Sequence, residues 1–165
     1  MRIWPALFIV FSCLLTSLTW AQDELKITDL SPVDREFMEQ QRSLLRDMAA
    51  IKLGRSFSGK SAADIALLQT LLDRRLVRPE QTRELQAMGI ILGDLLAAEL
   101  DMHWVIYEDD LGRSRALRYR ESDNYLFPVT MISRRQQAGS TTTVEHIYRK
   151  AYDIIDAVRT PLPFQ

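Results

Sequence analysis

The segment Gly54–Ser61 is the first whose residue types and spacing could do chemistry, because it fits the pattern G-x-x-x-x-G-K-[ST] at every position. In a phosphate-binding loop, backbone amides and the lysine hold the phosphates and the hydroxyl binds Mg²⁺. Such a loop must follow a β-strand, whereas the residues from Met48 to Leu53 continue a helical spacing of apolar side chains. We therefore interpret the match as a chance one and expect no nucleotide site and no cofactor.

Three consecutive acids, Glu108, Asp109 and Asp110, form the next candidate cluster. A calcium loop alternates its acids and continues to a distant glutamate, which this segment does not, so we interpret the acids as turn formers. Paired carboxylates can divide the roles of acid and base, which makes Glu108 and Asp110 the first catalytic candidates if the protein is an enzyme. The two histidines, His103 and His146, lie far apart in the sequence and match no zinc spacing, so we expect no metal site.

Arginines are concentrated in one region. Six of them lie between residues 113 and 135, against only two acids: Arg113, Arg115, Arg118, Arg120, Arg134 and Arg135. Alternation along a strand would place Arg118 and Arg120 on one face and Arg115 on the other. Solvated surfaces and pairing with the neighbouring acids account for part of this excess. The remainder suits an anionic ligand, such as a cell-envelope polymer or an acidic partner.

Helical patterns precede this region. Ser31, followed by a proline and then an acid three residues on, begins a helix that Gly54 ends. A second helix follows the Gly/Ser-rich loop, and Pro79 begins a third. The third helix contains Gly89 and Gly93, which lie four residues apart and so on one face. Because an interior glycine disfavours a helix, this pair predicts close packing of another element.

The pattern changes to strands at residue 103. Residues 103–108 and 113–120 predict an antiparallel hairpin, and residues 125–127 predict a short third strand. Helices follow over residues 128–137 and 142–158. The predicted fold class is therefore α+β, with helices at both ends around a small three-stranded antiparallel meander.

The N-terminal segment has the features of an export signal. Arg2 precedes an apolar stretch over residues 6–18, and small residues stand at the third and first positions before a cut after Ala21. The alternative is an uncleaved membrane anchor, which also places the domain outside the cytoplasm. Cleavage would remove Cys13, the single cysteine, so the mature chain would hold no disulfide. We expect a periplasmic or secreted protein.

The composition is that of an ordinary globular chain. It has 165 residues, of which 47% are hydrophobic and 26% charged, with a formal net charge of −1. A near-neutral balance gives no general attraction for nucleic acid. We divide the chain into a signal peptide (1–21), a flexible lead-in (22–30), an N-terminal helical segment (31–76) and an α+β core (77–160) that packs with that segment as one domain.

Several short segments between Leu68 and Val158 carry a family resemblance: Leu68–Asp73, Gly89–Gly93, Trp104–Ile106, Asp110–Arg113, Ala116–Tyr119, Phe127–Pro128 and Ser133–Arg135. In these segments the chain resembles a bacterial family known as domain of unknown function 3806. The resemblance implies a single α+β domain and no particular activity. It also suggests where a site would lie, on the hairpin from Trp104 to Tyr119 and at the start of the next helix, residues 128–135.

We therefore expect an exported bacterial envelope protein that binds a partner or an anionic ligand through an arginine-rich hairpin surface, without catalysis. The ligand-binding candidates are Trp104, Glu108, Asp110, Arg113, Arg118, Tyr119 and Arg134. The alternative is a hydrolase or transferase that acts on envelope material with carboxylates near the hairpin. We expect no nucleic-acid partner, and membrane contact only through the N-terminal segment if that segment is retained.

Overall fold

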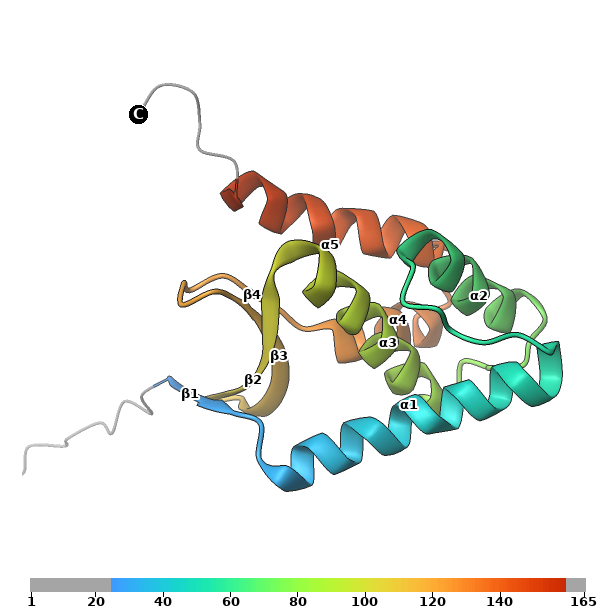
Figure 1. The fold of residues 1–165 in the computed structure, drawn as a ribbon, viewed down its shortest axis with the longest axis horizontal. Helices are drawn as coiled ribbons and strands as arrows, with labels where there is room; N and C mark the ends of the chain where they lie inside the picture. The colour runs from blue at the N-terminus through green and yellow to red at the C-terminus, as the bar shows by residue number, and fades with distance from the viewer. Residues whose placement is uncertain (1–24, 160–165) are drawn as a thin grey trace, which may run out of the picture.

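A computed structural model describes residues 25–159, and the predicted signal peptide, residues 1–21, lies outside the described residues. The elements in chain order are β1 (Lys26–Asp29), α1 (Pro32–Leu53), α2 (Ser61–Asp73), α3 (Thr82–Leu100), β2 (Met102–Asp109), β3 (Gly112–Tyr119), β4 (Tyr125–Leu126), the 3₁₀ turn η1 (Pro128–Thr130), α4 (Met131–Gln137) and α5 (Val144–Arg159). α3 runs through the middle of the molecule, with α1 along one side, α5 along the other and the curved sheet across one end (Figure 1).

The α+β class is confirmed, but the antiparallel sheet has four strands, in the order β1-β2-β3-β4, rather than the three that we predict. The additional strand is β1, which pairs with β2 so that Ile27 lies opposite Tyr107 and Asp29 opposite Val105. It falls within the range 22–30, which the sequence presents as a lead-in. A segment of four residues with one large apolar side chain carries too little alternation to predict a strand, and pairing with β2 supplies what the local sequence lacks.

The beginning and end of α1 follow from its own sequence. Ser31 is the N-cap residue, and its hydroxyl accepts a hydrogen bond from the backbone N–H of Asp34 at 3.1 Å. The carboxylate of Asp34 in turn accepts the backbone N–H of Ser31 at 3.3 Å, which completes a capping box. Gly54 ends the helix in the left-handed conformation, with φ near +62°. The cap places Asp34 beside the sheet, where it contributes to the site described below.

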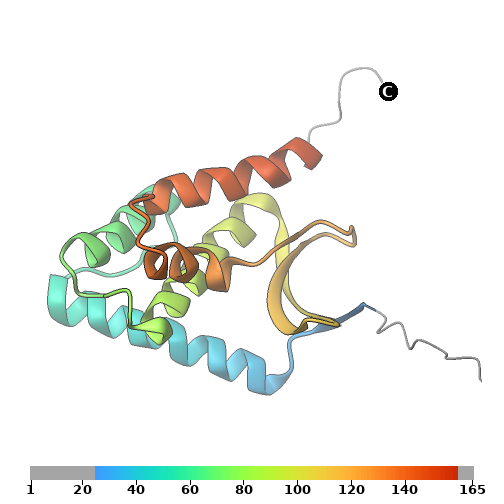
Figure 2. The same ribbon diagram turned by 180° about the vertical axis from the view of Figure 1, so that it is seen from behind.

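The glycines of α3 admit two other elements, which confirms the predicted close packing. A Cβ atom at Gly89 would lie 2.5 Å from the carbonyl oxygen of Pro128, so η1 lies directly on the helix backbone there. A Cβ atom at Gly93 would overlap the ring of Trp104, which comes from β2. Figure 2 shows η1 and α4 on the face of α3 that is turned away from the viewer in Figure 1. The two glycines thus fix where the hairpin and α4 lie relative to each other.

The core surrounds α3, whose Leu85, Met88, Leu92 and Leu96 are fully buried. Side chains from α1, α2, α5 and the sheet complete it. Within residues 25–159, no helix has both the length and the apolar character needed to cross a membrane.

Candidate ligand-binding groove

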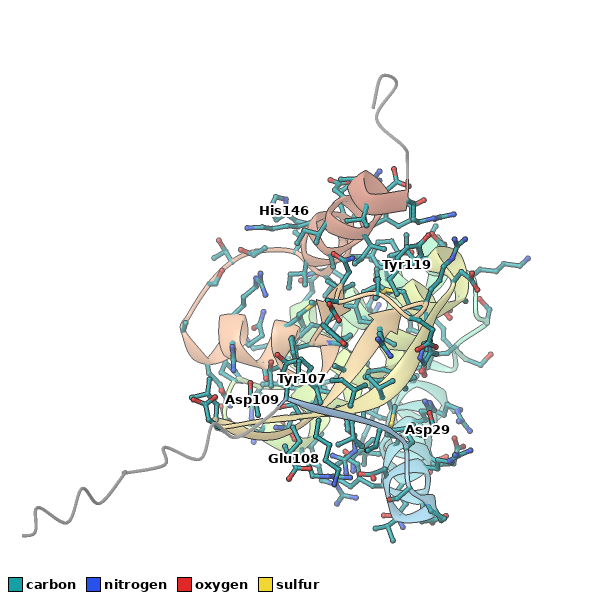
Figure 3. All side chains as sticks on the ribbon, turned by 90° about the vertical axis from the view of Figure 1, so that its left-hand side faces the viewer. Asp29, Tyr107, Glu108, Asp109, Tyr119 and His146 are labelled. Atoms are coloured by element: carbon teal, nitrogen blue, oxygen red, sulfur yellow. The ribbon has the colours of Figure 1, made fainter. Side chains whose placement is uncertain are left out.

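A groove of about 600 Å³ lies where the β2–β3 hairpin meets α1, η1 and α4. Three arginines and three aromatic residues line it: Arg113, Arg115, Arg134, Phe37, Tyr107 and Phe127. The rest of the lining consists of Gln86, Asp109, Leu111, Gly112, Ser114, Val129 and Thr130. We call this feature the arginine groove. Figure 3 looks onto this end of the molecule and labels Tyr107 and Asp109 of the groove beside Glu108.

Two of the arginines share one buried carboxylate. Arg113 donates to both oxygens of Asp34, over 3.1 Å from Nη1 to Oδ1 and 2.6 Å from Nη2 to Oδ2. The Nη2 atom of Arg115 donates to Oδ1 over 2.7 Å, and the hydroxyl of Ser31 donates to Oδ2. Asp34 itself is only 2% exposed. These hydrogen bonds, with that of Arg113 the strongest, hold the pKa of Asp34 far below its ordinary value although burial acts in the opposite direction.

Strand alternation explains why these two arginines meet Asp34. Arg113 and Arg115 point to the same face of β3 as Leu117, which is fully buried in the core. That face is turned toward the helices. Leu117 packs in the core, and Arg113 and Arg115, which lie nearer the hairpin turn, reach the N-terminus of α1. The guanidinium of Arg115 also lies 4.3 Å from the centroid of the Phe37 ring, one turn after Asp34. The contacts bind the hairpin to the first turns of α1.

Arg134 is the third cation of the arginine groove, and it comes from α4. Its side chain is exposed. Of the three groove arginines, it alone has no carboxylate within 4.0 Å among the described residues. Asp109, the acid in the groove lining, accepts the backbone N–H of Leu111 and so closes the hairpin turn. Arg134 is therefore the cation that is available to a ligand.

Aromatic rings form the apolar wall of the arginine groove. The ring centroid of Tyr107 lies 5.1 Å from that of Tyr125 and 5.2 Å from that of Phe127, both in edge-to-face geometry. Sequence reasoning misses Phe37, Tyr107 and Phe127 as site residues. Phe37 belongs to the apolar stripe of α1 and the other two to strand patterns, so each is accounted for as packing. Phe37 follows Asp34 by three residues, but the burial of that acid is known only from the structure.

The other predicted site residues lie outside the arginine groove. Arg118 points to the opposite face of β3 and closes the β3–β4 turn, where its Nε donates to the carbonyl of Ser122 at 2.9 Å and its Nη1 to Glu121 at 2.8 Å. Glu108 lies opposite Arg113 in the β2–β3 register, and Asp110 lies in the turn. Both of these acids are exposed, and neither lines the groove.

Trp104 and Tyr119 serve the fold. The indole N–H of Trp104 donates to Asp94 over 3.0 Å, and the ring packs on Gly93. Tyr119 is 7% exposed, and the guanidinium of Arg120 lies 5.0 Å from its ring centroid. The structure thus brings Arg113 and Arg134 of the predicted set together in one groove and separates the remaining five.

The loop with the phosphate-binding pattern holds a carboxylate of its own chain. The backbone N–H groups of Ser58 and Gly59 donate to the side chain of Asp64 at 2.8 and 2.7 Å. Because Asp64 is buried, these amides are occupied by an internal anion. The loop also follows α1 rather than a strand. In the described part of the chain, no three histidine, cysteine or acidic side chains gather as a metal site would require.

A second cavity, of about 750 Å³, lies between α2 and α5. Tyr148 donates to the hydroxyl of Ser61 at 3.5 Å, and Ser61 donates to Glu99. Burial is the main cause that raises the pKa of Tyr148 to about 12. These polar groups bond to one another, whereas Arg134 of the arginine groove has no carboxylate partner among residues 25–159. The smaller arginine groove is therefore the better candidate for a ligand.

Comparisons with known proteins define the kind of domain. The sequence model of a domain of unknown function (DUF3806) matches residues 64–148. A crystal structure of a protein from Bacteroides thetaiotaomicron resembles this fold with a TM-score of 0.72 and 18% sequence identity, over 80% of this chain and 48% of that one. The chain thus spans about half the length of that protein, and at this identity the likeness concerns the fold alone. No curated protein matches the sequence.

Proposed function

The chain belongs to the family of the domain of unknown function DUF3806, and we propose that it is a binding domain without catalytic activity whose arginine groove takes an anionic ligand. The observation that carries this proposal is Arg134. It is an exposed guanidinium in a groove with two further arginines and an aromatic wall, and no carboxylate of the described residues neutralises it. A guanidinium matches a carboxylate, sulfate or phosphate with paired hydrogen bonds.

The arrangement of the acids favours binding over catalysis. Hydrolysis of a glycosidic bond by a carboxylate pair needs two carboxylates that face the reacting bond. Asp34 is committed to two arginines, and Asp109 to the hairpin turn. Glu108 and Asp110 are exposed outside the arginine groove. The groove therefore offers positive charge and apolar rings, which suit recognition of an anion.

The compartment to which the protein is exported determines which ligands it can bind. The pattern of residues 1–21 supports export, so we propose that the ligand is a component of the cell envelope or an acidic partner in the same compartment. The formal net charge of −1 argues against nucleic acid, whose binding depends on a surplus of basic side chains. Any membrane contact would come from the N-terminal segment.

Fluorescence anisotropy with two labelled polyanions, polyglutamate and a galacturonate oligomer, tests the proposal. We expect at least one of them to bind the full chain, and Arg134→Gln to weaken that binding about tenfold, the effect of losing a charge-assisted hydrogen bond. Arg74→Gln is the matched control, because it removes the same charge from an exposed residue after α2. The proposal is wrong if neither polyanion binds, or if both variants weaken binding equally.

A further inference from the structure

The arginine groove continues past Arg134 into a second hollow of about 220 Å³, which we call the edge hollow. Phe127 and Arg134 line both. The edge hollow is also lined by Tyr125, Leu126, Met131 and Arg135. A ligand held at Arg134 can therefore extend in either direction, which favours a chain molecule over a single small anion.

The edge hollow meets the sheet at its open edge. The two residues of β4, Tyr125 and Leu126, point to opposite faces of the sheet, and both line the hollow together with Phe127, which follows the strand. The hollow therefore lies at the side of the strand. β4 is the last strand in the sheet order, and its partner is β3. Within residues 25–159, no strand pairs with its other side. That side is an edge of the sheet, where a further strand could pair with the backbone.

The far wall of the edge hollow is one face of α4. Met131, Arg134 and Arg135 are spaced three and four residues apart, so their side chains lie together on the helix surface. Nη1 of Arg135 donates to the carbonyl oxygen of Met131 over 2.7 Å, which holds the side chain along the helix. The hollow thus combines a strand edge, apolar contacts from Phe127 and Met131, and two guanidinium groups.

We propose that the ligand is an extended acidic peptide with an apolar residue, which adds as a strand to the open edge of β4. This inference rests on the proposed function of the arginine groove. A strand edge offers main-chain hydrogen bonds to a peptide, an apolar floor takes an alternate side chain, and the arginines take carboxylates. An acidic sugar polymer would satisfy the arginines but has neither a peptide backbone for the edge nor an aliphatic side chain for Phe127 and Met131.

Three labelled probes with equal negative charge test the strand addition by anisotropy with the full chain. They are a short peptide of alternating leucine and glutamate, the same peptide methylated on its backbone nitrogens, and a galacturonate oligomer. Methylation keeps the charge and removes the main-chain donors. We expect the parent peptide to bind at least about tenfold more tightly than the other two, the equivalent of one or two main-chain hydrogen bonds.

Arg135→Gln is the variant that reports on the edge hollow, because Arg135 lines that hollow and not the arginine groove. We expect it to weaken the parent peptide severalfold, with Arg74→Gln unchanged. Strand addition is overturned if the methylated peptide binds as tightly as the parent peptide, or if the galacturonate oligomer binds more tightly. In that case the proposed function still stands as long as Arg134→Gln weakens the binding of an acidic probe. Failure of every acidic probe to bind would overturn the proposed function itself.

Discussion

Asp34 joins three parts of the chain at a single carboxylate. It caps α1 through Ser31, and it accepts hydrogen bonds from Arg113 and Arg115 of β3. A buried acid is tolerated only when donors replace its water, and here the backbone cap and the two guanidinium groups do so. The same carboxylate forms ion pairs with two of the three arginines in the groove, so Arg134 is the groove arginine that no carboxylate of the described residues contacts.

Replacing Asp34 by asparagine should destabilise the fold. Asparagine keeps a side-chain oxygen that can accept the backbone N–H of Ser31 in the capping box, so the loss reports chiefly on the arginines. We expect the free energy of unfolding in urea to fall by about 2 kcal/mol, below the cost for a fully buried pair because Arg113 is 44% exposed. Asp47→Asn, an exposed substitution on the same helix, is the control. An equal effect of the two substitutions would show that the arginine contacts contribute nothing to stability.

The same carboxylate predicts how stability changes in acid. Its pKa is lowered in the folded state, so its contribution is present above the unfolded pKa of about 4 and is lost as the pH falls further. The difference in unfolding free energy between the natural protein and Asp34→Asn should therefore shrink below about pH 4. Urea titrations over a series of acidic pH values measure it. A difference that stays constant with pH would contradict the assignment.

At the scale of elements, α3 is the helix on which the groove is assembled. Its Gly89 touches the backbone of η1, which leads into α4 and so into Arg134. Its Gly93 makes room for Trp104 of the hairpin. The position of the groove walls therefore depends on two missing side chains in a helix that touches the groove only through Gln86.

Gly89→Ala should destabilise the protein although alanine favours helices. Helix propensity alone predicts a gain of about 1 kcal/mol, whereas overpacking against the carbonyl groups of η1 costs about 1–3 kcal/mol. We expect a net loss in urea denaturation and weaker ligand binding, because η1 must move. Gly93→Ala should also cost stability, since its added carbon would overlap the Trp104 ring, which the hydrogen bond to Asp94 holds in place. A gain in stability from Gly89→Ala would contradict the close contact.

The sequence predicts an element well when the residues that determine it lie close together in the chain. The N-cap at Ser31 and the C-terminal end at Gly54 each depend on residues close by in the chain, and the sequence predicts both ends of α1. The third helix begins at Thr82 rather than Pro79, because the side chain of Gln81 accepts the N–H of Arg78 and forms a turn before the helix. β1 forms because it pairs with β2, and the four residues of β1 alone carry no pattern that predicts this pairing.

The candidate site illustrates the same limit. Alternation along β3 correctly separates Arg118 from Arg115, because the period of a strand is local. The partner of Arg113, however, lies 79 residues away, and its identity depends on how α1 packs against the hairpin. The sequence therefore predicts which surface is rich in arginine, while the structure decides which of those arginines an internal acid already holds.

At the scale of the whole molecule, two polar clusters bind its separate parts together. The Asp34 cluster joins the sheet to α1 at one end. The hydrogen bonds from Tyr148 to Ser61 and from Ser61 to Glu99 join α5, α2 and α3 at the other. The first cluster depends on an ionised acid and the second on a neutral phenol. The molecule should therefore lose stability in acid through the Asp34 cluster and in alkali through the Tyr148 cluster.

The alkaline side of this pH dependence can be tested on Tyr148 alone. Burial raises its pKa from 10.0 to about 12, so the folded state favours the neutral phenol. Its contribution is therefore complete below about pH 10 and is lost as the pH rises toward about 12. Tyr148→Phe keeps the ring and removes the hydroxyl, so the natural protein should lose unfolding free energy more steeply than this variant across that interval. Tyr152→Phe, whose ring centroid lies 6.2 Å from that of Tyr148, is the matched control and should follow the natural protein. If the unfolding free energies of all three proteins change in parallel with pH, folding does not shift the pKa of the Tyr148 phenol.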